Sequence, residues 1–243
     1  MNLKTNIMGV MFDSYTIQET VQKATSYEKT PFVIVTPNPE IVQVAKKDKE
    51  FMDVLNSADI VTPDGIGIVY ASKILGGHIK QRAAGFDICC GILDVLAKMK
   101  GTVYLFGGKP GVAEIASKNI EQKYKGVSVV GFSDGYFDEH KEKTIIEDIK
   151  TKKPDLLLVC LGAKKQELWI HKYKDVLDAK ILIGAGGSID VFAGTVKRAP
   201  DIFIKLGLEW FYRLIKQPKR FIRMLQLPLF LIEIVVKRRS LKS

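Results

Sequence analysis

The feature that most constrains this chain is a repeated alternation between short apolar runs and longer segments with helical spacing. The apolar runs are rich in valine, isoleucine and leucine. Six of them are predicted strands: Phe32–Val35, Asp59–Thr62, Thr102–Phe106, Val127–Gly131, Leu156–Leu161 and Ile181–Ile183. Alternating strands and helices are typical of a parallel sheet with helices on both faces. We therefore predict a doubly wound, Rossmann-like α/β fold with a mostly parallel sheet.

The segments between these strands carry apolar residues at helical spacing. Residues Glu40–Ser57 are predicted to form one helix, which Asn38 can cap. Its apolar face would comprise Ile41, Val44, Phe51 and Leu55. A second helix is predicted from the apolar stripe Ile88, Ile92, Val95 and Met99, and further helices are predicted over Gly111–Tyr124 and Glu139–Lys150.

The pattern changes near Pro200, where the strand-like runs stop. We predict an α/β core over residues 1–195 and a helical C-terminal appendage over residues 196–243. The stretch Ile204–Arg223 is aromatic and basic at helical spacing, and Pro218 should divide it. From residue 195 onward, twelve Lys and Arg residues stand against three acidic ones, which gives +9 of the chain's total of +10. The positive charge is therefore concentrated in this tail.

Basic and aromatic residues on one helix suit the surface of an anionic membrane. A merely solvated helix face is the alternative. Nucleic acid is a rival partner for a basic patch, but no groove-reading or RNA-stacking module is visible. The longest apolar stretch, Leu225–Val236, is shorter than the roughly 20 residues of a membrane-spanning helix. We predict a protein that lies on a membrane without crossing it, has no nucleic-acid partner, and self-associates through the apolar face of its tail.

Three cysteines, Cys89, Cys90 and Cys160, give no framework for a disulfide-stapled fold. The N-terminus has no apolar run of signal-peptide length. We therefore expect a cytoplasmic protein, associated peripherally with the cytoplasmic membrane. The adjacent Cys89 and Cys90 are interpreted as structural core residues rather than nucleophiles.

Four polar clusters follow predicted strands, at the edge where doubly wound sheets bind ligands. They are Thr36–Glu40, Thr62–Gly67, Phe106–Gly111 and Gly184–Asp190. Glycine turns let backbone N–H groups approach phosphate, although such turns also occur for steric reasons alone. Two glycine-rich turns favour a diphosphate-bearing ligand, with Gly107, Gly108, Gly186 and Asp190 as candidate substrate-binding residues. Asp64, between a proline and a glycine, is either a functional carboxylate or a turn and cap residue.

Other site chemistries fit the sequence less well. The dinucleotide fingerprint fails because Tyr70 stands where its third glycine would be, and no P-loop motif occurs. The three histidines, His78, His140 and His171, are scattered, and there is no Asp-x-Asp pair. We therefore predict neither a metal site nor a cofactor.

Taken in order, the polar clusters resemble the WecG/TagA/CpsF glycosyltransferase family. The matching pieces are Thr36–Glu40, Ala58–Gly67, Arg82–Asp87, Phe106–Gly111, Asp134–Phe137, Gln166-Glu167, Ala193–Pro200 and Gly207–Arg213. They fall within residues 32 to 224, nearly the whole chain. Lys164 stands where members of the family often carry proline, a departure that should change the shape of that loop but leave Gln166 in place.

This resemblance implies an inverting, metal-independent transfer in teichoic acid synthesis. N-Acetylmannosamine would move from UDP to N-acetylglucosaminyl-diphospho-undecaprenol, in β-1,4 linkage, at the inner face of the cytoplasmic membrane. Alternatives are another UDP-sugar donor, such as UDP-N-acetylmannosaminuronate or UDP-glucose, or a nucleotide- or NAD-binding regulatory module docked to membrane.

The resemblance also implies roles for particular residues. Asp64 would be the base that deprotonates the acceptor hydroxyl. Thr36, Asn38 and Gln166 would position the sugars. The leaving diphosphate would be stabilised by helix N-termini and by arginines, namely Arg82 from the core and Arg213, Arg220 and Arg223 from the tail.

Overall fold

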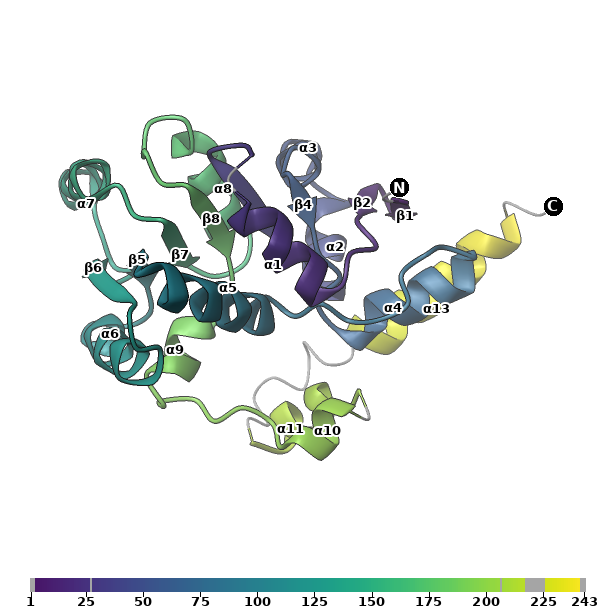
Figure 1. Ribbon diagram of the computed structural model, residues 1–243. Coiled ribbons are helices and arrows are strands. Elements are labelled where there is room, and N and C mark those ends of the chain that lie inside the picture. The colour runs from purple at the N-terminus through teal and green to yellow at the C-terminus, as the bar shows by residue number, and fades with distance from the viewer. Residues whose placement is uncertain (1–2, 27, 206, 217–225, 241–243) are drawn as a thin grey trace.

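The computed structural model describes residues 3–26, 28–205, 207–216 and 226–240 (Figure 1). Its centre is a six-stranded sheet in which every pair of neighbouring strands is parallel, in the order β4-β3-β8-β7-β5-β6. The strands are β3 (Phe32–Val35), β4 (Ile60–Val61), β5 (Thr102–Gly107), β6 (Ser128–Ser133), β7 (Leu156–Cys160) and β8 (Ile181–Gly184). All six strands predicted from the sequence are confirmed, to within a few residues at their ends.

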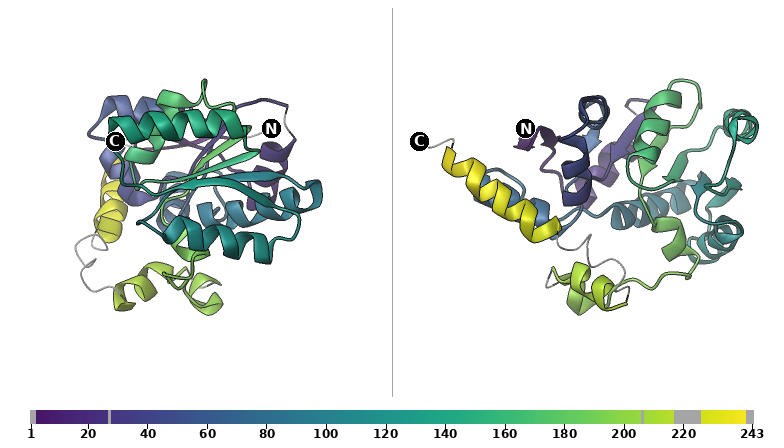
Figure 2. Two further views of the ribbon diagram at one scale, coloured as in Figure 1. Left: turned by 90° about the vertical axis from the view of Figure 1, so that its left-hand side faces the viewer. Right: turned by 180° about the vertical axis from the view of Figure 1, so that it is seen from behind.

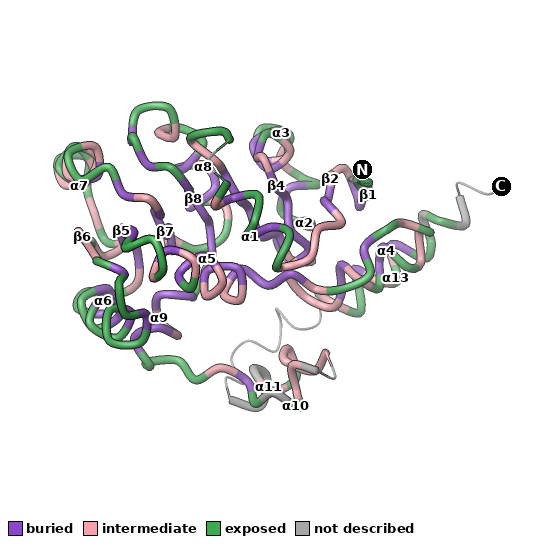
Figure 3. The backbone as a smooth tube through the Cα atoms, in the orientation of Figure 1, coloured by how far each residue is buried: buried purple, intermediate pink, exposed green. Residues whose placement is uncertain are grey.

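Helices cover both faces of this sheet, which confirms the doubly wound α/β prediction (Figure 2). One layer contains α2 (Pro39–Ala45), α3 (Lys49–Asn56), α4 (Ile66–Leu75), α7 (Glu139–Lys152) and α8 (Lys165–Tyr173). The other contains α1 (Ile17–Thr25), α5 (Gly85–Met99), α6 (Val112–Lys123) and α9 (Ser188–Phe192). Between them, the strands other than the edge strand β6 are almost entirely buried (Figure 3).

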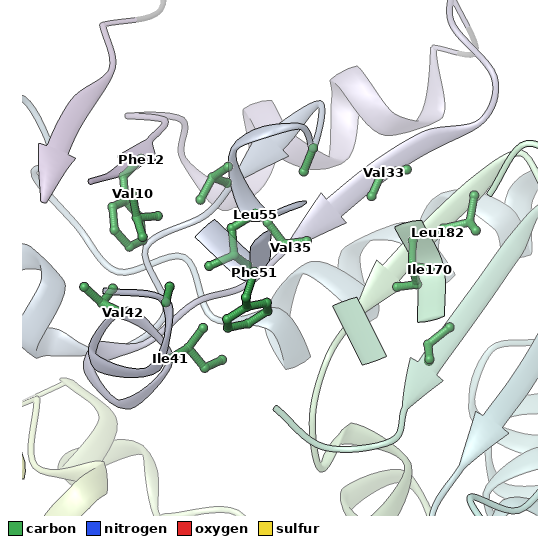
Figure 4. Close-up of a cluster of buried hydrophobic side chains, with 14 of the residues drawn as sticks. Val10, Phe12, Val33, Val35, Ile41, Val42, Phe51, Leu55, Ile170 and Leu182 are labelled. Carbon is green, nitrogen blue, oxygen red and sulfur yellow. The ribbon is translucent and has the colours of Figure 1, made fainter. Parts of the chain in front are cut away.

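Side-chain alternation along the strands divides the interior into two apolar clusters. On β3, Val33 and Val35 belong to one cluster, whereas Ile34 belongs to the other. In the first cluster, Val33 and Val35 lie among side chains from α2, α3 and α8, including Phe51 (Figure 4). Because both faces of β3, β4, β5, β7 and β8 are buried, these strands appear in the sequence as nearly continuous apolar runs.

The prediction of one helix over Glu40–Ser57 is wrong, because the segment forms two helices. Asn38 caps the first, accepting a hydrogen bond from the Ile41 backbone N–H at 3.0 Å. Asp48 then caps the second, accepting from the Phe51 backbone N–H at 3.0 Å. In the first helix the buried side is formed by Ile41, Val42 and Ala45, so Val44 is not part of it and is 38% exposed. On α5, Met99 likewise ends the predicted stripe 54% exposed, because it lies in the last turn.

The first thirty residues contain structure that the sequence analysis did not predict. Strands β1 (Thr5–Ile7) and β2 (Val10–Phe12) form an antiparallel hairpin. Asp13 then ties this hairpin to β4, donating its backbone N–H to Val61 O at 2.9 Å and accepting the Val61 N–H at 2.8 Å. Three-residue strands give too short a periodic signal to be recognised from one sequence.

The described part of the tail consists of helices joined by irregular segments, among them residues 196–200. It contains α10 (Asp201–Lys205), α11 (Glu209–Lys216) and α13 (Gln226–Ser240). The helix predicted over Ile204–Arg223 is interrupted at Gly207, whose φ is +71°, and Pro218 lies outside the described residues. Among the described helices, none has the length and apolar character needed to cross a bilayer.

Helix α13 returns to the α/β core and packs against α4 and α2 (Figure 1). Its Phe230 and Ile234 are buried and belong to the first apolar cluster. On its polar side, Glu233 accepts a hydrogen bond from the Gln43 side chain at 2.8 Å and pairs with Lys46. The division of the chain at residue 195 stays a prediction. Although α13 belongs to the predicted appendage, its Phe230 and Ile234 pack into the apolar interior formed by residues before 195.

Candidate active site

A pocket of about 280 Å³ opens at the carboxyl ends of β3, β4, β7 and β8. It brings together six residues that the sequence predicted as site residues: Thr36, Asn38, Asp64, Gln166, Gly186 and Asp190. This edge is where an open parallel sheet leaves room for a ligand. Residues of the tail form the remaining wall, so the pocket is closed by segments far apart in the sequence.

The floor of the pocket is the junction of the central strands β3 and β8. Thr36, at the end of β3, is buried and donates its hydroxyl to the Gly184 carbonyl at 2.8 Å. The hydroxyl proton is thereby engaged, and the oxygen keeps lone-pair capacity for a ligand. A Cβ at Gly85 would lie 3.0 Å from the Thr36 hydroxyl oxygen, so a larger residue at the start of α5 would push on Thr36.

The loops that carry Asn38 and Asp64 lie against each other. The Asp64 backbone N–H donates to the Pro37 carbonyl at 3.3 Å and to the Thr62 carbonyl at 3.1 Å. Gly65 follows with φ of +96°, a conformation that favours glycine. The Asn38 side-chain oxygen caps α2, which leaves its NH₂ group to act as a donor to a ligand. These contacts fix the Asp64 and Asn38 side chains on one wall of the pocket.

Gln166 is held by two hydrogen bonds that orient its amide. Its oxygen accepts from the Gly186 backbone N–H at 3.1 Å, and its nitrogen donates to Glu167 Oε1 at 2.8 Å. Gly186 lies in the glycine-rich turn after β8, with φ of +56°. Lys164, just before α8, has φ of +68°, which proline cannot adopt. The loop therefore has a shape that proline at this position would forbid, while Gln166 lines the pocket as expected.

The neighbouring Glu167 gives a pH-dependent prediction. Burial raises the pKa of its carboxyl, and the hydrogen bond from Gln166 only partly offsets this. With a raised pKa, the folded protein binds more protons than the unfolded chain, so stability falls as pH rises through this window. We expect the free energy of unfolding of Glu167→Gln, relative to wild type, to increase with pH above about 4.5 and then level off. Urea unfolding across this pH range measures the difference, and parallel curves would contradict it.

Arg82 lies beside the pocket within a network of ion pairs. It contacts Glu209 of α11, and its Nη2 lies 3.6 Å from Asp87 Oδ2. Burial lowers the pKa of Arg82, but the hydrogen bond and charge of Glu209, with the charges of Asp64 and Asp87, outweigh burial and raise it. Arg82 is therefore a permanent cation already engaged by carboxylates. Its predicted role at the diphosphate stays a prediction.

The tail supplies pocket residues that the sequence analysis did not single out. Val196, Lys197, Arg198, Glu209 and Tyr212 all line the cavity, as does Phe86 from α5. Arg198 pairs with Asp87 at 2.6 Å, and its guanidinium lies 5.0 Å from the centre of the Phe86 ring. The sequence did contain a hint of this wall, because the segments 193–200 and 207–213 both match the family pattern. Nothing in the pattern, however, distinguished Lys197 or Tyr212 from their neighbours as residues that face the site.

Five other candidate residues were predicted to bind substrate. Gly107 and Gly108 follow β5 but do not line the pocket; a Cβ at Gly107 would meet the Cys160 carbonyl oxygen at 2.2 Å, which is a steric reason for glycine. Arg213 belongs to α11, and its side chain is not described. Arg220 and Arg223 lie outside the described residues. The proposed contacts of all five residues with substrate stay predictions.

None of the three cysteines or three histidines lines the pocket. Cys89 and Cys160 are buried, and burial raises the pKa of the Cys160 thiol to about 12. His171 is exposed on α8, with Nδ1 3.3 Å from the Ser57 hydroxyl. Within the described ranges, no three His, Cys, Asp or Glu side chains gather as metal ligands would.

The fold and the pocket together define a doubly wound α/β protein with a candidate ligand site beyond the carboxyl ends of its strands. The model of the glycosyl transferase WecG/TagA/CpsF family matches residues 5–243. This chain belongs to that family.

The similar proteins include enzymes of one name from two genera. The chain is 39% identical, over 89% of its length and 84% of the relative, to the N-acetylglucosaminyldiphosphoundecaprenol N-acetyl-beta-D-mannosaminyltransferase of Bacillus subtilis (strain 168). It is 34% identical, over 99% of its length and 95% of the relative, to the protein of the same name from Staphylococcus aureus (strain MRSA252).

Proposed function

We propose that this chain transfers N-acetylmannosamine from UDP to N-acetylglucosaminyl-diphospho-undecaprenol, with inversion at the sugar, in the synthesis of the teichoic acid linkage unit. The observation that carries the proposal is the pocket itself, where Thr36, Asn38, Asp64 and Gln166 converge from three strand ends. The names of the relatives over nearly the whole chain support the same donor and acceptor.

The reaction assigns a task to each wall of the pocket. The acceptor hydroxyl attacks the anomeric carbon of the donor, the bond from that carbon to the diphosphate oxygen breaks, and UDP leaves with the electron pair. Asp64 takes the proton of the acceptor hydroxyl as the new bond forms. Asn38 and Gln166 donate hydrogen bonds that hold the sugars in line, which converts binding into orientation.

The leaving diphosphate needs positive charge, and Lys197 is suited to supply it. The cationic side chains among the lining residues are Lys197 and Arg198. Arg198 is engaged by Asp87, whereas Lys197 forms no ion pair with any residue that the structure describes. Lys197 therefore keeps its charge for a ligand.

We expect Lys197→Ala to raise the KM for the UDP-sugar about 10- to 100-fold, because losing one hydrogen bond to a charged group weakens binding by about this factor. Lys197→Arg should preserve most of the affinity. The matched control is Lys118→Ala, which removes an exposed lysine paired with Glu114 on α6. Equal KM values for Lys197→Ala and the control would exclude the diphosphate contact.

We propose that the enzyme works at the cytoplasmic membrane, where a polyprenyl-linked acceptor resides. Helix α13 presents Leu229, Ile232 and Val236 outward, at 63%, 60% and 61% exposure, opposite the buried Phe230 and Ile234. An apolar row next to the basic end of the chain suits an interfacial helix. Self-association through the same surface stays a prediction. If it occurs, it would compete with lipid for these side chains.

UDP release from the purified full chain tests the proposed function. The donors are UDP-N-acetylmannosamine, UDP-N-acetylmannosaminuronate and UDP-glucose, each with a dispersed lipid-linked N-acetylglucosamine diphosphate. EDTA is present in one series and Mg²⁺ in another. The proposal expects release with the first donor in both series. Release with only another donor would overturn the assigned sugar, and release that needs Mg²⁺ would overturn metal independence.

A further inference from the structure

Glu167 is a buried carboxylate whose chemistry is not used by the reaction described above. It lies in the first turn of α8, next to Gln166, and is 1% exposed. Its Oε1 accepts a hydrogen bond from Gln166 Nε2 at 2.8 Å. Its Oε2 is buried and has no hydrogen-bond partner among the described residues.

Burial of the Glu167 Oε2 atom lowers the stability of the folded protein. A buried polar atom without a partner destabilises the fold, and an apolar side chain of similar volume would avoid that cost. Buried unpartnered oxygens are uncommon in native proteins, so each asks for an explanation. Burial raises the pKa of Glu167, which favours the neutral acid and lowers the cost without removing it. The remaining cost points to a role that a leucine could not perform.

The role lies in the geometry of Gln166. An amide side chain can turn over, exchanging its oxygen and its NH₂ group with little change in shape. In the pocket, the Gly186 N–H requires the oxygen on one side. The Glu167 oxygen requires the NH₂ group on the other. A donor on one side and an acceptor on the other therefore hold the Gln166 amide in a single orientation. In this orientation one N–H of Gln166 is bound to Glu167, and the second remains for a ligand.

We propose that Glu167 is a positioning residue that fixes the Gln166 amide so that it presents an N–H donor to the sugar in the pocket. The inference rests on the proposed function, because it assigns this donor to the reacting sugars. Without Glu167, the amide can turn its oxygen toward the pocket, which repels an acceptor group and leaves the Gly186 N–H without its partner.

The backbone before α8 supports the same conclusion. Lys164 has φ of +68° and ψ of −49°, a region that residues with side chains rarely adopt. Its side chain pairs with Asp48 at 2.7 Å, which ties the strained residue to the first turn of α3. Strain of this kind persists where the surroundings fix it, often at functional sites. Here it sets the start of the helix that carries both Gln166 and Glu167.

The first experiment compares Glu167→Leu with Glu167→Gln in the full chain, using UDP release with the donor that wild type accepts. Glu167→Leu should lower kcat about 10²-fold, the effect of a misplaced positioning group. Glu167→Gln keeps an acceptor oxygen for Gln166 and should restore most of kcat. The matched control is Glu142→Leu. Glu142 of α7 accepts hydrogen bonds from Trp169 and Tyr173 of α8, at 3.0 and 3.1 Å, so this variant removes a carboxylate that holds the same helix without contacting Gln166. The control should keep kcat within a few-fold of wild type, and a control as defective as Glu167→Leu would overturn the proposal.

A double-mutant cycle separates positioning from loss of fold. In a Gln166→Ala background, Glu167→Leu should change kcat by less than about twofold, because the group through which it acts is gone. A full further loss in that background would overturn the proposal. Thermal unfolding of each variant identifies any that does not fold, and Glu167→Met then replaces Glu167→Leu.

A crystal structure of Glu167→Leu gives a readout that does not depend on activity. We expect the Gln166 amide to rotate away from the Gly186 N–H, and an unmoved amide would overturn the proposal. Wild-type activity is measured first with each donor. Absence of turnover with every donor counts against the proposed function, whereas the orientation of Gln166 in this structure still decides the role of Glu167.

Discussion

Replacing Asp64 with asparagine is expected to lower turnover by about 10³-fold while UDP still binds, because general base catalysis contributes between about 10² and 10⁴. Asparagine keeps the size of the side chain but cannot accept the proton of the acceptor hydroxyl. The backbone at this residue is held by its own hydrogen bonds, from the Asp64 N–H to the Pro37 and Thr62 carbonyls, and asparagine can keep both. UDP release gives kcat, and calorimetric titration with UDP gives the affinity.

Asp59→Asn is the matched control, because Asp59 stands at the opposite end of the same strand segment. It accepts from the Val33 backbone N–H at 2.8 Å and from Lys29, remote from the pocket. This variant should lower stability and leave kcat close to wild type. Turnover retained in Asp64→Asn would remove the base from the mechanism. A loss of UDP affinity as large as the loss of kcat would assign Asp64 to binding instead.

Removing residues 196–243 is expected to reduce turnover by at least about 10²-fold, because it takes away several groups of one pocket wall at once. Lys197, Arg198, Glu209 and Tyr212 all leave with this segment. The truncated chain should also be less stable, since deleting one buried phenylalanine side chain such as Phe230 costs about 3–5 kcal/mol. Urea unfolding and UDP release measure the two effects separately.

A shorter truncation that removes only residues 226–243 distinguishes the two parts of the tail. It deletes α13 but keeps the segments that line the pocket. We expect it to lose stability and co-sedimentation with anionic vesicles, and to retain activity toward a short-chain, water-soluble acceptor at low temperature. Full activity of the longer truncation would show that the tail is no part of the site. Undiminished vesicle binding by the shorter one would place the membrane contact outside α13.

The sequence predicted the strands and much of the site well, for a physical reason. Strands buried on both faces are continuous apolar runs, and the polar residues that follow them must gather at one edge of the sheet. That is why the positions of Thr36, Asn38 and Asp64 directly after strands were enough to predict that they lie at one edge, whereas Gln166 entered only through the family resemblance; all four line the pocket. Asn38 was also correctly predicted as the cap of α2.

What the sequence could not provide was long-range pairing. The apolar residues of Glu40–Ser57 keep a helical spacing across the break at Asp48, so the sequence alone does not reveal that the segment forms two helices. The pairing of Arg82 with Glu209 joins residues 127 positions apart, and no local pattern indicates it. The burial of Phe230 and Ile234 depends on a surface of α4 and α2, whereas in the sequence the same residues suit a lipid surface equally well.

The return of α13 to α2 and α4 has a consequence for synthesis of the protein on the ribosome. Gln43 and Glu233, which bond at 2.8 Å, are 190 residues apart, and β8 is the strand that joins β3 to β7. Through most of translation, the strand pair β3-β4 and the group β5-β6-β7 therefore exist without the strand that connects them. The apolar surface that Phe230 and Ile234 cover stays open until the last residues emerge. Such late, distant contacts slow folding, and a nascent chain with this surface open offers chaperones a binding site.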